Sequence, residues 1–211
     1  MAKHTGKKIT PKIKLHRGDL PAGASFTGPL AVDTEAMGLN PHRDRLCLVQ
    51  MSAGDGVCHL VQMIDKPAPR LASVLADKKI EKIFHFARFD AAILYHTLGV
   101  MPVPLYCTRI ASRLARTYTD RHGLRDLCRE LLDIDISKQE QSSDWGADTL
   151  SQAQQAYAAG DVLYLHQLRA ILDDMLKREG RDKLAAQCFA FIPTRVTLDL
   201  LGWDDDFFAH S

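Results

Sequence analysis

Four acidic side chains and one tyrosine occupy positions from which they could meet. Asp33 and Glu35 are two residues apart in an apolar, strand-like run, so both point to one face. Tyr157 and Asp161 are one turn apart in a helical run, and Asp90 ends another patterned segment. Clustered carboxylates repel one another unless cations neutralise them, and oxygen ligands suit Mg²⁺ or Mn²⁺. The pattern predicts two divalent cations of the kind that serve phosphodiester chemistry.

The elements that must position these residues alternate between strand and helix. Three consecutive strands, predicted at 30–35, 46–52 and 57–63, would open a mixed sheet as a meander. The next stretch predicts helices at 69–76, 90–98, 109–116 and 123–132 and strands at 80–86 and 103–106. A polar loop, 135–148, then leads into a predicted helix at 150–177. Asp90 lies where a predicted strand ends and a helix begins. In sheets with crossover helices, ligand sites form beyond the carboxyl ends of the strands.

The same residues carry a family resemblance. Asp33-x-Glu35, the run His85–Asp90 and Tyr157-x-x-x-Asp161 resemble the three motifs of the DEDD superfamily of 3′→5′ exonucleases, in its tyrosine-containing branch. Segments 38–46, 123–127 and 137–145 are similar to ribonuclease D, and the short length and the ending 198–203 resemble its nanoRNase C subgroup. One departure is Cys107-Thr108, where ribonuclease D often has aspartate before threonine.

The resemblance covers the chain from about residue 15 and implies both a fold and a mechanism. The fold would be an α/β, ribonuclease H-like one, with a mixed central sheet flanked by helices. Asp33, Glu35 and Asp161 would hold two Mg²⁺ or Mn²⁺ ions, and Asp90 would complete the shell of one. Tyr157 would orient the attacking water, and nucleoside 5′-monophosphates would be released. The subgroup also implies very short RNA, dinucleotides above all, as substrate, and a homo-oligomer that is a ring-shaped octamer.

The polar loop before the last predicted helix holds candidate substrate contacts. Lys138, Ser142 and Ser143 are suited to holding a terminal 5′ phosphate, and otherwise they are surface residues of the loop. Trp145 is either a packing residue or the side chain that pins this loop near the site. These alternatives remain open on sequence alone.

Three further residues are substrate-binding candidates. Leu39 occupies the place where similar short-RNA exonucleases put an apolar wedge between two bases, or else it packs beneath Pro41 as a turn residue. His85 is a candidate contact or a hydrogen-bonded core histidine. Arg88 faces either solvent or a substrate phosphate.

Composition limits the possible partners and the domain organisation. The 211 residues have a net charge of +1, which argues against gripping long nucleic acid by bulk electrostatics. Residues 1–14 predict a flexible basic N-terminus and 15–211 a single exonuclease domain. The five cysteines form no Cys-x-x-Cys pair, which argues against a zinc site or a disulfide framework. Without a membrane-spanning run or a signal-peptide core, a cytoplasmic protein with no membrane partner is expected.

Two alternatives to a dinucleotide exonuclease remain. One is a ribonuclease D-like trimmer of longer RNA 3′ ends, against which the near-neutral charge counts. The other is a non-catalytic nucleic-acid-binding module on the same fold, against which the five intact motif positions count.

Overall fold

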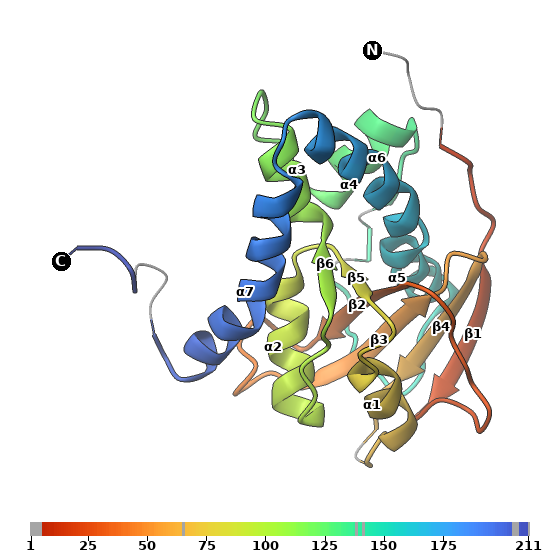
Figure 1. Cartoon of the computed structure of the whole chain (residues 1–211). Helices are drawn as coiled ribbons and strands as arrows, with labels where there is room; N and C mark the ends of the chain where they lie inside the picture. Colours follow the sequence, from red (N-terminus) through yellow and green to blue (C-terminus); the bar gives the residue numbers. More distant parts are fainter. Residues whose placement is uncertain (1–5, 65, 138, 141, 204–206, 211) are drawn as a thin grey trace.

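The architecture is a twisted mixed sheet between layers of helices (Figure 1). The computed structural model describes residues 6–64, 66–137, 139–140, 142–203 and 207–210. Within these residues six strands form one sheet in the order β1-β4-β3-β2-β5-β6. They are β1 (Lys12–Arg17), β2 (Leu30–Ala36), β3 (Leu46–Ser52), β4 (Val57–Gln62), β5 (Lys82–Phe84) and β6 (Leu105–Cys107). The predicted α/β class and mixed central sheet are confirmed.

Strand directions place several strand ends at one edge of the sheet. Strand β3 runs antiparallel to both β2 and β4, whereas β5 pairs in parallel with both β2 and β6. The carboxyl ends of β2, β5 and β6 therefore lie at the same edge, where ligand sites of such sheets form. The predicted meander is confirmed, because β2, β3 and β4 agree with their predicted bounds within one residue.

The helices follow the predicted order with two major differences, the division of one predicted helix into two and the unpredicted helix α7 (Asp182–Leu200). The helices are α1 (Pro69–Ala76), α2 (Ala87–Leu98), α3 (Thr108–Ala115), α4 (Leu124–Leu127), the π-helical turn η1 (Cys128–Leu132), α5 (Gln152–Leu163), α6 (Leu165–Arg178) and α7. The single helix predicted at 150–177 is instead two, which meet at the buried Tyr164. The chain turns there because α5 packs on β2, β3 and β4, whereas α6 packs chiefly on α3.

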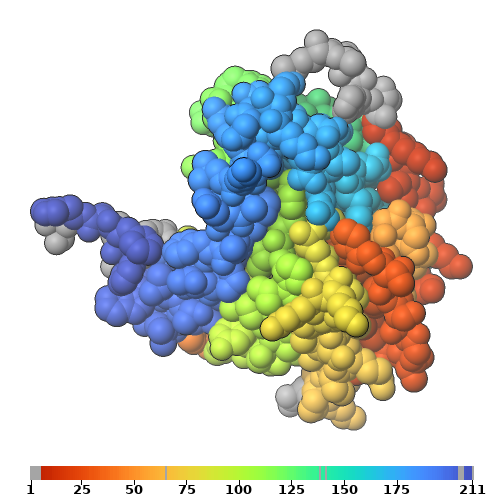
Figure 2. Space-filling view, in the orientation of Figure 1, coloured from red at the N-terminus to blue at the C-terminus, as the bar shows by residue number. Residues whose placement is uncertain are grey.

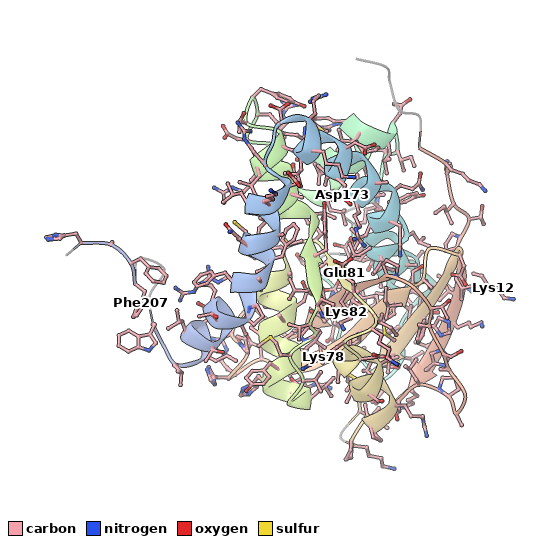
Figure 3. All side chains as sticks on the ribbon, viewed as in Figure 1. Lys12, Lys78, Glu81, Lys82, Asp173 and Phe207 are labelled. Atoms are coloured by element: carbon pink, nitrogen blue, oxygen red, sulfur yellow. The ribbon has the colours of Figure 1, made fainter. Side chains whose placement is uncertain are left out.

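The first strand was not predicted. Lys12–Arg17 pairs in parallel with β4 along its whole length, so regular structure begins before residue 15. This is an edge strand whose lysines are exposed, and Lys12 points away from the sheet in Figure 3. Charged side chains on an edge strand discourage pairing with other chains. The same charges led to the prediction of a flexible basic N-terminus at residues 1–14.

Alternation along the strands divides the apolar core between the two faces of the sheet. Ala31, Leu48 and Leu60 face one core, to which α5 and α6 contribute. Leu30, Val32 and Val49 face the other, to which α1, α2 and α7 contribute. Because Asp33 and Glu35 continue the series of Ala31, they point toward the face that α5 covers. Among the helices in the described ranges, none combines the length and apolar character needed to cross a bilayer.

Candidate metal centre and active site

Three carboxylates from two elements converge beside the sheet. Asp33 and Glu35 lie on β2, and Asp161 lies on α5, which covers that face. One carboxylate oxygen from each residue lies within 4.8 Å of the other two, and all three residues are half-buried. The predicted convergence of these acids is therefore observed.

The start of helix α5 fixes its position over β2. Ser151 caps the helix through its side-chain oxygen, which accepts from the Gln154 amide at 3.1 Å, and the Gln154 side chain accepts from the Ser151 amide at 2.9 Å. Such a capping box satisfies two backbone donors that a helix end otherwise leaves unpaired. One and two turns further on, the same helix presents Tyr157 and Asp161.

Asp90 approaches the site from a different direction. It lies in the first turn of α2, whose cap Phe86 adopts a left-handed backbone with φ of 72°. Thr34, which points to the opposite face of β2 from Asp33 and Glu35, donates its hydroxyl to Asp90 Oδ1 at 2.7 Å. Asp90 is thus buried next to the three clustered carboxylates without belonging to the 4.8 Å group. Its charge adds to the effect of burial in raising the pKa of Asp33, Glu35 and Asp161.

Burial and mutual repulsion make these acids hard to ionise in the absence of a cation. Burial, with the charges of Asp161 and Asp90, raises the pKa of Glu35 to about 9. Burial also raises the pKa of Asp90 to about 7, and burial together with Asp90 raises that of Asp161 to about 7. The pKa of Asp33 lies well above its ordinary value because of burial and its three acidic neighbours. Divalent cations would reverse this preference, and an all-oxygen donor set fits Mg²⁺ or Mn²⁺.

Tyr157 is protonated in this environment. Burial, followed by the charges of Asp161, Glu35 and Asp33, raises the pKa of its phenol above the ordinary value. A phenol that resists ionisation can donate and accept hydrogen bonds but is a poor base at neutral pH. The geometry therefore suits Tyr157 to orienting a water molecule.

Residues 144–147, just before α5, are held against the site by hydrogen bonds and ring packing. Trp145 is buried, and its ring centroid lies 6.0 Å from that of Tyr157. Gln154 donates to the Asp144 carbonyl at 3.0 Å, Gln62 donates to the Ala147 carbonyl at 2.9 Å, and Arg45 donates to the Gly146 carbonyl at 2.9 Å. Trp145 is thus both a packing residue and a contact that places the loop beside Tyr157.

The proposed phosphate-holding residues are only partly visible. Ser142 is exposed, and the half-buried Ser143 accepts a hydrogen bond from Gln154 at 3.2 Å, which leaves its hydroxyl hydrogen available. Lys138 lies outside the described residues. Both serines thus shortly precede Trp145, the residue whose ring lies near that of Tyr157.

The other predicted substrate contacts have different surroundings. Leu39 is 83% exposed in the loop after β2, so it does not pack beneath Pro41. His85 shows the hydrogen-bonded alternative, because its Nδ1 lies 2.9 Å from Thr108 Oγ1, and burial and Arg109 lower its pKa to about 3. Arg88 makes a bidentate ion pair with Asp199 of α7, at 2.6 and 2.8 Å. Its guanidinium is thus already engaged by a carboxylate from the far end of the chain.

Sequence reasoning missed two polar residues that contact the acids. Thr34 binds Asp90, and Gln50 of β3 donates its Nε2 to Asp33 Oδ2 at 3.2 Å. The signal for Gln50 was present, since it is a lone amide in a strand that is otherwise almost wholly apolar and buried throughout. Its partner depends on the register between β2 and β3, which the sequence alone does not give.

Comparison with known proteins gives the same assignment as the geometry. Residues 20–177 match the 3′-5′ exonuclease family. NrnC of Brucella melitensis bound to pGG is 57% identical, with a TM-score of 0.92 over 96% of this chain and 100% of that one. The same Brucella protein with bound Mg²⁺ is also 57% identical, with a TM-score of 0.90 over 94% and 99% of the two chains.

The curated relatives are longer proteins. A ribonuclease D of Gluconacetobacter diazotrophicus is 36% identical over 173 residues, which are 80% of this chain but 43% of that protein. The chain thus spans less than half of that relative. The family match, the likeness to NrnC and the convergent carboxylates confirm the predicted resemblance: the chain belongs to the 3′-5′ exonuclease family and is similar to both ribonuclease D and NrnC.

Proposed function

We propose that the protein hydrolyses very short RNA, dinucleotides above all, from the 3′ end to nucleoside 5′-monophosphates. The observation that carries this proposal is the likeness, over nearly the full length of both chains, to an NrnC structure bound to the dinucleotide pGG. The clustered carboxylates supply the chemistry that such a substrate needs.

The roles of the residues follow from their surroundings. When bound, the divalent cations supply an activated water molecule and stabilise the leaving 3′ oxygen. Asp33, Glu35 and Asp161 provide the clustered oxygen ligands, and Asp90 adds a fourth carboxylate from α2. Tyr157, kept protonated by the acids around it, positions the water by hydrogen bonding.

The role of Tyr157 can be tested by removing only its hydroxyl. We expect Tyr157→Phe to lower kcat by roughly 10²–10³, the range for losing a positioned catalytic group, with metal affinity preserved. Tyr95→Phe, on the exposed side of α2, is the matched control and should leave kcat unchanged. An unchanged kcat in Tyr157→Phe would show that the hydroxyl has no part in the reaction.

The raised pKa values predict how metal binding depends on pH. The metal-free folded protein keeps protons on these acids that the unfolded chain has already lost, so its stability falls as pH rises toward about 9. Bound cations remove this penalty. The gain in Tm on replacing EDTA with Mg²⁺ should therefore grow between pH 7 and 9, with apparent affinity rising about tenfold per pH unit for each proton displaced.

Lys82 also has a pKa between 7 and 9, but it does not affect the difference in Tm between Mg²⁺ and EDTA. Burial lowers the pKa of Lys82 to about 8, but its ammonium lies among backbone carbonyls near the start of β5 and not among the clustered acids. Its effect is common to both melting curves and cancels in their difference. A Tm gain that did not vary with pH would contradict the assignment of these acids as the metal ligands.

Length preference is supported by two features beside the catalytic residues. The exposed Leu39 stands on the loop that follows Glu35, where it could separate two bases. The anchored loop with Ser142 and Ser143 lies beside Tyr157 and, with Lys138, could hold a terminal 5′ phosphate. A site that binds a terminal 5′ phosphate favours the shortest substrate. In longer RNA the phosphate at the same position is a diester that is linked to a further nucleotide.

A time course on 5′-phosphorylated RNAs from dinucleotides to heptanucleotides tests the proposal. We expect the dinucleotide to be hydrolysed fastest, and Leu39→Ala to lower kcat/KM on it by about tenfold or more, the scale of one buried apolar side chain. Leu184→Ala, at another exposed leucine near the start of α7, should have no effect. A wild-type enzyme that preferred the heptanucleotide would instead favour the ribonuclease D-like trimming of longer ends.

We further propose that the protein is a homo-oligomer, of eight copies as the resemblance implies. Phe191, Trp203, Phe207 and Phe208 are exposed and contact one another, with ring centroids 5.0–5.9 Å apart. Figure 2 shows the described residues that follow α7 standing out from the body, and Figure 3 labels Phe207 among them. Aromatic groups gathered on such a surface are typical of protein interfaces.

Light scattering tests the assembly. We expect a mass several times the 23.5 kDa of one chain, and a shift to smaller species when Phe207 and Phe208 are both replaced by alanine. Leu184→Ala again serves as a control that should keep the wild-type mass. A wild-type monomer at micromolar concentration would contradict this proposal.

A further inference from the structure

Strand β3 contains a polar side chain that packing alone does not explain. Gln50 is 0% exposed, and the flanking residues Val49 and Met51 are equally buried and apolar. Its cross-strand partner on β4 is Leu60. An amide in such surroundings costs free energy unless its hydrogen-bonding groups are satisfied.

Only one half of this amide has a partner. Gln50 Nε2 donates to Asp33 Oδ2 at 3.2 Å, and Asp33 is its partner on β2 in the antiparallel register. Gln50 Oε1 is buried and has no hydrogen-bond partner among the residues that the structure describes. Unsatisfied buried acceptors are uncommon in folded proteins and call for a specific reason. Leucine at this position would fill the space without that cost.

We propose that Gln50 is a positioning residue of the metal centre. Its Nε2 fixes the orientation of the Asp33 carboxylate by occupying Oδ2, so that the carboxylate meets a cation in one preset geometry. Because Asp33 is a neighbour of three other acids, its hydrogen bond to a neutral donor also disperses charge without competing for the cation. Groups behind the direct ligands commonly orient them and tune metal affinity in this way. The inference rests on the proposed function only through the presence of a cation.

The test separates metal affinity from stability. Gln50→Leu removes both the donor to Asp33 and the unpaired Oε1. We expect its affinity for Mn²⁺, measured by calorimetric titration without RNA, to fall about 10–100-fold, the range for losing a group that orients a ligand. Its Tm in EDTA should be equal to or higher than that of the wild type.

Gln62→Leu is the matched control on the neighbouring strand β4. Gln62 is also a buried glutamine, but among the described residues its amide donates to the Ala147 and Asp148 carbonyls and to none of the clustered acids. We expect this variant to have a lower Tm and an unchanged Mn²⁺ affinity. If Gln50→Leu fails to fold, Gln50→Met, which keeps the length of the side chain, replaces it.

The outcomes distinguish this inference from the proposed function. Wild-type protein that binds no Mn²⁺ would overturn the metal site itself. If the wild type binds Mn²⁺ and Gln50→Leu binds it with an affinity within about threefold of the wild type, only the role of Gln50 is overturned. Such a difference is well below the effect of losing one group that orients a metal ligand. Equal losses of affinity in the Gln50 and Gln62 variants would also overturn it, because general destabilisation would then be the cause.

Discussion

The structure depends on keeping four carboxylates close together while removing them from water. Burial raises the pKa of all four, and the charges of neighbouring acids raise it further for Asp33, Glu35 and Asp161. The metal-free site is therefore under electrostatic strain. A site of this kind persists only if the surrounding fold is rigid enough to hold it. Buried strands, a capped helix and hydrogen-bonded loops provide that rigidity, and a bound cation repays the cost.

The topology of the sheet explains why the support comes from two sides. Strand β2 has the antiparallel β3 on one side and the parallel β5 on the other. From β3 comes Gln50, which contacts Asp33 across the ladder; after β5 the chain turns into α2 and delivers Asp90. Alternation along β2 then separates the two: Asp33 and Glu35 face α5, whereas Thr34 faces Asp90. A shift of one residue in the β2–β3 register would exchange these faces and dismantle the site.

The sequence predicted that the motif carboxylates converge because their spacing encodes which face of a strand or helix they occupy. Residues two apart on a strand, or four apart on a helix, share a face whatever the rest of the fold is. What it could not predict depends on distant segments. The bend at Tyr164 reflects the different packing partners of α5 and α6, and β1 is recognisable as a strand only from its pairing with β4. The partner of Arg88, Asp199, lies 111 residues away.

The placement of charge also bears on the length of the proposed substrate. An exonuclease that holds a long strand gains affinity from many phosphate contacts on a basic surface. Here Arg88 and Arg195 both bind Asp199, and the chain as a whole carries a net charge of only +1. We therefore expect the binding energy to come chiefly from a few contacts near the metal centre. That favours a fixed pocket over an extended groove, and the contacts of Trp145 with Tyr157 and of Gln154 with the Asp144 carbonyl fix one wall beside the site.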